Sequence, residues 1–164
     1  MMTDPKKDII VRTIARLFVP FLQIYALYVI MHGHYSPGGG FQGGVVLAAC
    51  FVLLLITHGL EETQKRISEK IVVILSCSGV FIYTGIGVLC LVLAGNFLDY
   101  HKLGQILNVS PAEARSFGIL GVEIGVGIAV MAVMYSVFYN IATAGNDMSV
   151  HENSIHDNDE REEN

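Results

Sequence analysis

Four long apolar blocks, nearly free of charged residues, constrain the fold of this chain more than any other feature. They cover residues 9–31, 41–60, 71–94 and 117–141. Each has close to the roughly 20 residues that an α-helix needs to cross about 30 Å of hydrocarbon. Charged residues make up 15% of the chain, whereas about 25% is usual in soluble domains. The pattern excludes a soluble core and predicts an all-α integral membrane protein with four transmembrane helices.

The Lys and Arg residues indicate how these spans are oriented. Eight of the ten lie in the N-terminal flank with the start of the first block, in the link between the second and third blocks, or in the C-terminal tail. Only Lys102 and Arg115 lie in the opposite connections. Because Lys and Arg are enriched in cytoplasmic flanks, both termini are predicted to be cytoplasmic. Residues 30–34 hold no small-x-small cleavage site, so the first span is expected to stay attached.

The chain divides into a membrane part and an acidic tail. Residues 1–144 form the predicted four-helix membrane domain, and residues 145–164 carry seven acids and one Arg. Because the tail holds this surplus of acids, it accounts for the net charge of −5. It is expected to be disordered or to dock on a partner. The chain as a whole lacks the basic surface that nucleic-acid binding requires.

The connection at residues 95–115 predicts a short surface helix and then the start of the last span. Leu103, Ile106 and Leu107 have helical spacing. In the run Ser110-Pro111-Ala112-Glu113, Ser can cap a helix, Pro suits the first helical position, and Glu suits the positive helix end. A helix is therefore expected to begin at this run.

A glycine-rich turn joins the first two blocks. Residues 31–44 contain six glycines, one proline and the pair His32 and His34. Such a backbone can adopt positive φ angles, and its polar groups must lie at the water boundary or be covered by protein. The histidines either hydrogen-bond backbone groups of a tight turn or handle protons, because imidazole titrates near neutral pH.

The residues predict neither a cofactor nor an enzymatic centre. No Lys follows the glycines as in a phosphate-binding loop. The pair His32 and His34 has no third metal ligand nearby. The three cysteines, Cys50, Cys77 and Cys90, all lie inside spans and are interpreted as small buried hydrophobic residues. No nucleophile with a neighbouring base appears, so a self-contained enzyme is not expected.

Glu123 is the one carboxylate within the four blocks. A charged group inside a membrane is costly unless it is paired, solvated or protonated, and it commonly marks an ion pathway. The alternative is a hydrogen-bonded contact to a neighbouring subunit. Gly118, Gly121 and Gly125 mark another face of the same helix, suited to close helix packing.

Two stretches resemble one family. The first is His32-Gly33-His34-x-Ser36-Pro37-Gly38-Gly39-Gly40-Phe41-x-Gly43-Gly44, followed closely by Val46-Leu47-Ala48-Ala49. The second is Gly121-Val122-Glu123-Ile124-Gly125-Val126-Gly127. Both resemble the MnhB/MrpB family, whose members are small subunits of Mrp-type multisubunit cation/proton antiporters. The resemblance covers roughly residues 9–139, and the acidic tail lies outside it.

The resemblance implies a small subunit of a large helical membrane complex in the cell membrane. Such complexes exchange cytoplasmic Na⁺ for external H⁺, and their large subunits resemble the proton-pumping subunits of respiratory complex I. Similar small subunits occur in membrane-bound hydrogenases and related ferredoxin-driven complexes, so the host complex stays open. The implied partners are the other subunits, membrane lipid, and Na⁺ and H⁺ as transported ions.

The residues also limit what this chain does alone. One intramembrane carboxylate and no intramembrane Lys cannot form the relay of ionisable groups that a self-sufficient antiporter needs. Two hypotheses remain: Glu123, His34 and His32 line an ion pathway near the external face, or the chain is a scaffold. Pro37 and Phe41 are further positions expected to matter. The turn motif, from Ser36 and Pro37 through Gly38, Gly39, Gly40 and Phe41 to Gly43 and Gly44, is expected to be structural.

Overall fold

Long helices dominate the computed structural model, which describes residues 5–33, 35, 38–60, 63, 67–94 and 96–162, with side chains described only within residues 9–145. The long helices are α1 (Pro5–Met31), α2 (Gly39–His58), α4 (Glu69–Ala94) and α6 (Pro111–Glu162). The short elements η1 (Tyr100–Lys102) and α5 (Leu103–Leu107) precede α6. Each long helix contains a stretch that is long and apolar enough to cross a membrane. This confirms the predicted all-helical membrane architecture for the part of the chain that the structure describes.

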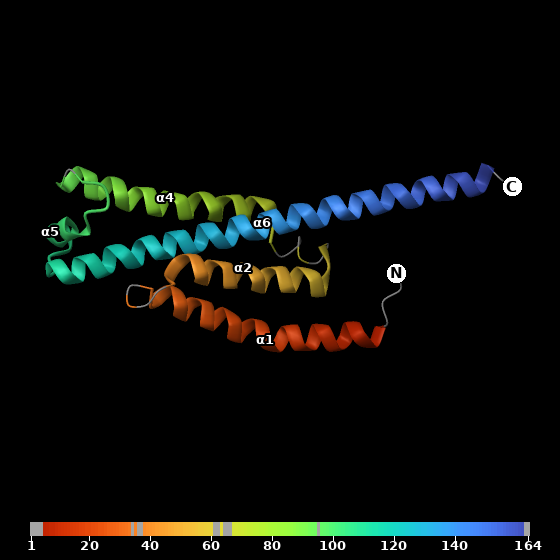
Figure 1. The fold of residues 1–164 in the computed structure, drawn as a ribbon, viewed down its shortest axis with the longest axis horizontal. Helices are drawn as coiled ribbons and strands as arrows, with labels where there is room; N and C mark the ends of the chain where they lie inside the picture. Colours follow the sequence, from red (N-terminus) through yellow and green to blue (C-terminus); the bar gives the residue numbers. More distant parts are fainter. Residues whose placement is uncertain are drawn as a thin grey trace.

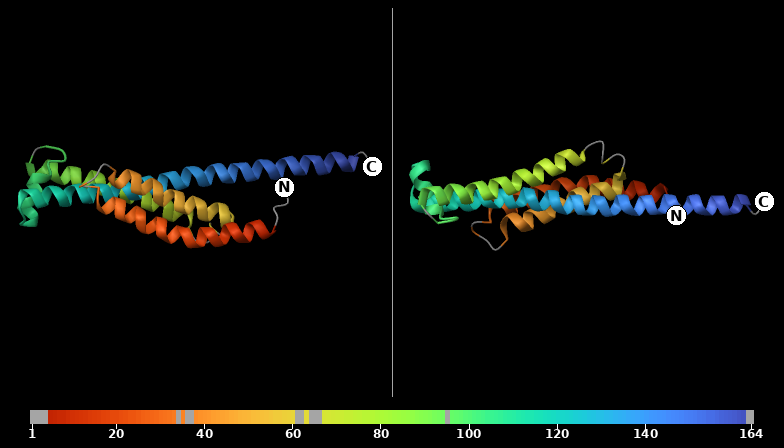
Figure 2. Two further views of the ribbon diagram at one scale, coloured as in Figure 1. Left: turned by 60° about the horizontal axis from the view of Figure 1, so that its bottom comes forward. Right: turned by 90° about the horizontal axis from the view of Figure 1, so that it is seen from above.

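The four long helices lie side by side in a row (Figure 1). Helix α6 packs between α4 and α2, and α1 packs on α2 at the edge of the row. The start of α1, the end of α2, the start of α4 and the end of α6 lie toward one end of the row, whereas the end of α1 and the short helix α5 lie toward the other end (Figures 1 and 2). The last helix is continuous to Glu162, so its backbone shows no break at residue 145.

Small residues allow the helices to approach one another closely. A Cβ atom on Gly79 of α4 would lie 2.6 Å from the carbonyl oxygen of Gly125 in α6. A Cβ atom on Gly44 of α2 would lie 2.7 Å from the carbonyl oxygen of Gly127, also in α6. Since lipid is as apolar as a Leu side chain, such van der Waals packing is a main source of helix association in membranes.

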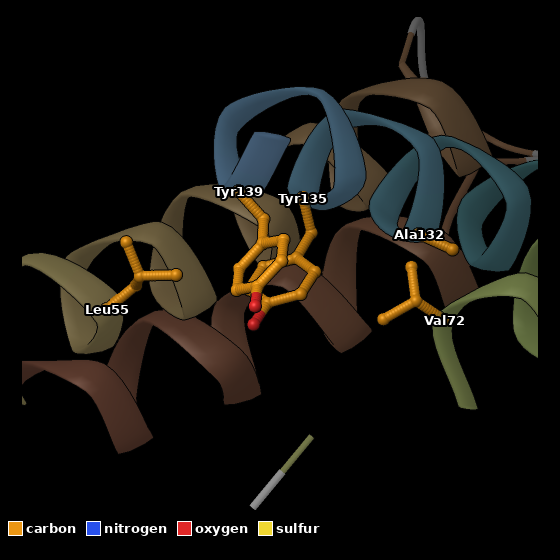
Figure 3. Packing of buried hydrophobic residues seen from close by; sticks show 5 residues of the cluster. All are labelled: Leu55, Val72, Ala132, Tyr135 and Tyr139. Carbon is orange, nitrogen blue, oxygen red and sulfur yellow. The ribbon is translucent and has the colours of Figure 1, made fainter. Parts of the chain in front are cut away.

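The largest buried cluster lies among α2, α4 and α6, toward the end of the row that holds the start of α1 and the end of α6. It consists of Leu55, Val72, Ala132, Tyr135 and Tyr139 (Figure 3). The two tyrosine rings stack with centroids 6.2 Å apart. This cluster joins all three helices through side chains, in addition to the close backbone contacts along α6.

The predicted short helix and helix start are both confirmed. The short helix is α5, and α6 begins at Pro111. The Ser110 hydroxyl donates to the Glu113 carboxylate at 2.8 Å, and the backbone N–H of Ser110 donates to the same carboxylate at 3.1 Å. The Glu113 backbone N–H donates back to the Ser110 hydroxyl oxygen. This reciprocal capping box satisfies donors that the start of a helix otherwise leaves open.

The interpretation of the three cysteines as buried is wrong for one of them. Cys50 and Cys90 are buried, but Cys77 is exposed on α4, and all three are free thiols. Large apolar side chains are exposed nearby, such as Phe81 on α4, and also on α1, such as Phe21. A membrane helix has lipid-facing positions that are as apolar as its packed positions, so hydrophobicity alone does not predict burial.

Candidate functional site

Glu123 of α6 lies directly against the glycine-rich turn. A Cβ atom on Gly39 would lie 2.5 Å from the Glu123 carboxylate oxygen Oε1, and one on Gly33 would collide with the same carboxylate. A Cβ atom on Gly40 would collide with the backbone carbonyl of Glu123. The carboxylate oxygen Oε2 is buried. The two features that the sequence singled out separately therefore form one site.

The site lies at the N-terminus of α2. Gly38, the residue before this helix, has no side chain that could cap it, and the first turn of α2 contains no acidic residue. A helix N-terminus has unsatisfied backbone N–H groups and a partial positive charge, which favour a negative group. The Glu123 carboxylate, which belongs to α6, therefore lies at the end of α2 where the helix dipole favours a negative charge.

Gly39 adopts a conformation that needs glycine. Its φ angle is +64°, in the left-handed region that other residues adopt at a cost. This conformation occurs at the first residue of α2 and beside Oε1 of Glu123. The turn thus brings the backbone close to the carboxylate in a way that a side chain at residue 39 would prevent.

His32 is bonded back to its own helix. Its ring nitrogen Nδ1 lies 3.1 Å from the carbonyl oxygen of Tyr28, and the two rings stack with centroids 4.1 Å apart. The imidazole is exposed. For His32, this geometry fits the interpretation that the histidine hydrogen-bonds a nearby backbone group.

The other motif residues divide between described and undescribed positions. His34, Ser36 and Pro37 lie outside the described residues. Phe41 is 62% exposed on α2. Gly43 faces α1, where a Cβ atom would lie 2.8 Å from the carbonyl oxygen of Ala26. The second half of the motif therefore packs α2 against its neighbours.

Helix α6 presents two different glycine faces. Gly127 faces Ile30 of α1 and the carbonyl oxygen of Gly40, on the side of the Glu123 site. Three other glycines face α4 and η1: Gly118 meets the Tyr100 ring, Gly121 meets Ile86, and Gly125 meets Gly79. Burial is the main cause that raises the pKa of Tyr100, and the nearby Cys90 and Tyr83 raise it further. The Tyr100 phenol therefore stays neutral at physiological pH. Glu123 thus faces α2, while Gly121 and Gly125, on another face of α6, pack against α4.

Two residues that were not named as candidate site residues also help to build the site. Ile30 of α1 packs beside Gly43 and Gly127, and Gly33 lies against the carboxylate. Gly33 carried a sequence signal, as one of the six turn glycines, but Ile30 is one apolar residue among many. No group of three or more His, Cys, Asp or Glu side chains that could hold a metal ion occurs within the described ranges.

Comparisons with known proteins match most of the chain. A family model described as "Domain related to MnhB subunit of Na+/H+ antiporter" matches residues 10–136. Curated relatives named "Putative antiporter subunit mnhB2", from Staphylococcus aureus strains Newman, JH1 and COL, are each 30% identical over 135 residues. These alignments cover 77% of this chain and 93% of each relative. Glu123 and the glycine-rich turn both lie within the range of the family model.

Proposed function

Because this chain belongs to the MnhB family of Na⁺/H⁺ antiporter subunits, we propose that it exchanges no ions alone and serves the assembly and ion pathway of a multisubunit antiporter. It is a transporter component and a multi-pass membrane protein. Its partners are the other subunits of the complex and the surrounding lipid, and Na⁺ and H⁺ are the ions that the complex carries. The proposed location is the cell membrane.

The observation that supports an ion pathway is the position of the Glu123 carboxylate. It lies inside a membrane-spanning stretch, with Oε2 buried, against Gly33 and Gly39 at the N-terminus of α2. An ionisable residue inside the membrane is costly, so a carboxylate at such a position indicates a functional site by default. The helix end favours negative charge at the same point.

The distribution of positive charges supports an external location for this site. With both termini in the cytoplasm, as the Lys and Arg residues predict, the opposite end of the row faces outward. That end holds the end of α1 and the short helix α5 (Figure 1). Glu123 would then contact an ion or proton route near the external face.

Dependence on other subunits follows from the small number of ionisable groups. Glu123 is the one carboxylate within the four apolar blocks, and no Lys lies in them. A complete exchange cycle needs several such groups along a path. The exposed apolar faces of α1 and α4 are available for contact with neighbouring subunits, which would supply the remaining ionisable groups.

A scaffold role is the second candidate, and the glycine contacts favour it. The backbones of α2 and α6 meet at Gly40, and those of α4 and α6 meet at Gly79. In this role the glycine-rich turn fixes the position of α2 and no ion contacts the chain. The host could also be a hydrogenase-type complex, but the relatives above are named as antiporter subunits, which favours the antiporter.

Replacing Glu123 by Gln separates the two roles. The complex is expressed as the sole Na⁺/H⁺ antiporter of a cell, and exchange is measured in inverted membrane vesicles. Loss of exchange with normal co-purification of the other subunits is expected for a pathway. The matched control is Glu113→Gln, which makes the same change in the exposed cap of the same helix. Normal exchange in Glu123→Gln vesicles would overturn the pathway and leave the scaffold.

A further inference from the structure

Ile30 of α1 reaches across α2 to α6. In the row of helices, α2 lies between α1 and α6 (Figure 1). A Cβ atom on Gly43 of α2 would collide with the Ile30 side chain, and one on Gly127 of α6 would lie 3.0 Å from Ile30 Cδ1. Ile30 itself is 6% exposed. Its side chain therefore fills a junction of three helices at which the other two helices contribute only glycine.

This junction lies about one helical turn from the Glu123 carboxylate, toward the end of α6. Gly127 follows Glu123 by four residues, which is about 6 Å along the helix axis. Helix α1 runs in the opposite direction, and Ile30 precedes Gly33, which lies against the carboxylate, by three residues. Both helices thus place the junction on the side of Glu123 that faces away from the glycine-rich turn.

The helices on this side of Glu123 are packed too closely for water. A Cβ atom on Gly44 of α2 would lie 2.7 Å from the carbonyl oxygen of Gly127 and 3.0 Å from Cβ of Val130, both in α6. A methyl group does not fit at this contact, so a water molecule does not fit either. Residues 124–134 of α6 are all apolar or glycine. The next side chain of α6 that carries an exchangeable proton is Tyr135, about 18 Å from Glu123 along the axis.

We propose that Ile30 is a hydrophobic seal, which closes the Glu123 site on this side, so that protons reach the carboxylate only from the side of the glycine-rich turn. The proposal rests on the ion-pathway function proposed for Glu123. Alternating access requires that a site is open to one side of the membrane at a time, because access from both sides would let protons leak. On the orientation that the Lys and Arg residues predict, the sealed side is the cytoplasmic side. Ile30 acts as a positioning residue, because it keeps water from the carboxylate and supplies no chemistry of its own.

The test measures proton leak through the complete complex. An imposed pH gradient across inverted vesicles is followed with a pH-sensitive dye, with no Na⁺ added. Ile30→Ala is expected to speed the decay of the gradient severalfold, because the shortened side chain opens the junction to water. Ile30→Val keeps a branched apolar side chain and is expected to leak far less than Ile30→Ala. Ile24→Ala is the matched control, since it makes the same change at a position of α1 that is 67% exposed, and parent-like decay is expected.

A second substitution shows whether the leak passes through Glu123. Glu123→Gln, added to Ile30→Ala, is expected to return the decay to the rate of the parent complex. A leak that persists in this double variant would overturn the proposal, as would parent-like decay in Ile30→Ala vesicles in which the other subunits co-purify normally. The exchange assay of Glu123→Gln alone decides the ion-pathway proposal separately, because the leak is measured without Na⁺.

A further pair of variants covers the case in which Ile30→Ala reduces assembly. Ile30→Thr and Ile30→Val have nearly the same shape and differ by a hydroxyl group. A merely structural role of the side chain volume would affect both variants equally. Faster decay of the pH gradient with Ile30→Thr is the expected result, and equal decay on assembled complex would contradict the seal.

Discussion

Gly40 of α2 lies so close to Glu123 of α6 that a methyl group on Gly40 would collide with the Glu123 backbone carbonyl. The two helices therefore meet through their main chains at the level of the buried carboxylate. The same pair of residues fixes the helix packing and the position of the candidate ion-pathway group. Mutations around Glu123 can separate these two roles, because some disturb only its side chain and others disturb its backbone.

Gly40→Ala is expected to destabilise the subunit, because the added methyl group meets backbone that cannot rotate away. Overpacking of this kind costs about 1–3 kcal/mol. The measurement is the thermal stability of the purified complex. Gly85→Ala is the matched control, since a Cβ atom on Gly85 of α4 would have no neighbour within 4 Å. Equal stability of the two variants would contradict the close contact.

Gly33→Ala is expected to reduce exchange more than stability. The three atoms nearest to the added methyl group all belong to the carboxylate end of the Glu123 side chain, which can move aside. Assembly should stay near normal while the carboxylate leaves its position at the α2 N-terminus. Exchange rate and co-purification are measured on the same vesicles. A variant with normal exchange would show that the position of the carboxylate is unimportant.

Gly39→Ala is expected to affect both properties. Its φ angle of +64° imposes strain on any residue with a Cβ atom, about 1–2 kcal/mol for an L-residue in the left-handed region, and the methyl group also meets Oε1 of Glu123. Asn tolerates positive φ better than Ala. A comparison of Gly39→Asn and Gly39→Ala by thermal unfolding therefore isolates the backbone strain, and equal stability would argue against it.

Ser110→Ala is expected to weaken the start of α6. The substitution removes the hydroxyl that bonds Glu113 in the capping box, which stabilises a helix by about 0.5–2 kcal/mol. A lower thermal unfolding temperature with unchanged exchange is the expected result. Glu113→Gln should have a smaller effect, because an amide oxygen can still accept from Ser110. A Ser110→Ala variant as stable as the parent protein would contradict the cap.

The thiols offer a direct check of which faces are covered. In single-cysteine variants of the detergent-solubilised chain, a small maleimide is expected to modify Cys77, which is exposed. Cys50 and Cys90 are each 0% exposed and should resist modification. Mass spectrometry of the labelled protein measures the extent of reaction. Rapid labelling at Cys50 would show that α2 packs less closely than described.

Much of the fold could be predicted because its signals are local. The length of an apolar block predicts a span without knowledge of its neighbours, and the Ser110 to Glu113 run predicts a helix start from four adjacent residues. The site was only partly predictable. Gly39 and Glu123 each carried a signal, but their contact depends on α2 and α6 packing together, which no local pattern encodes.

Burial of particular side chains was the least predictable property. Cys77 was expected to be buried because it lies in an apolar span, yet it is exposed. In a soluble protein, the polar residues of a helix mark its outer face. In α4 the outer face is apolar as well, with Phe81 among its exposed residues. The sequence of α4 therefore lacks the difference between polar and apolar positions from which burial is usually deduced.

Three residues around Glu123, namely Gly33, Gly39 and Gly40, have no side chain. Their contribution to the site consists of peptide groups, whose chemistry is the same whichever amino acid carries them. Such surroundings cannot be adjusted in small steps by exchanging one side chain for a similar one, because every replacement adds bulk. This part of the subunit should therefore change little during evolution, and ion preference should vary through residues elsewhere in the complex.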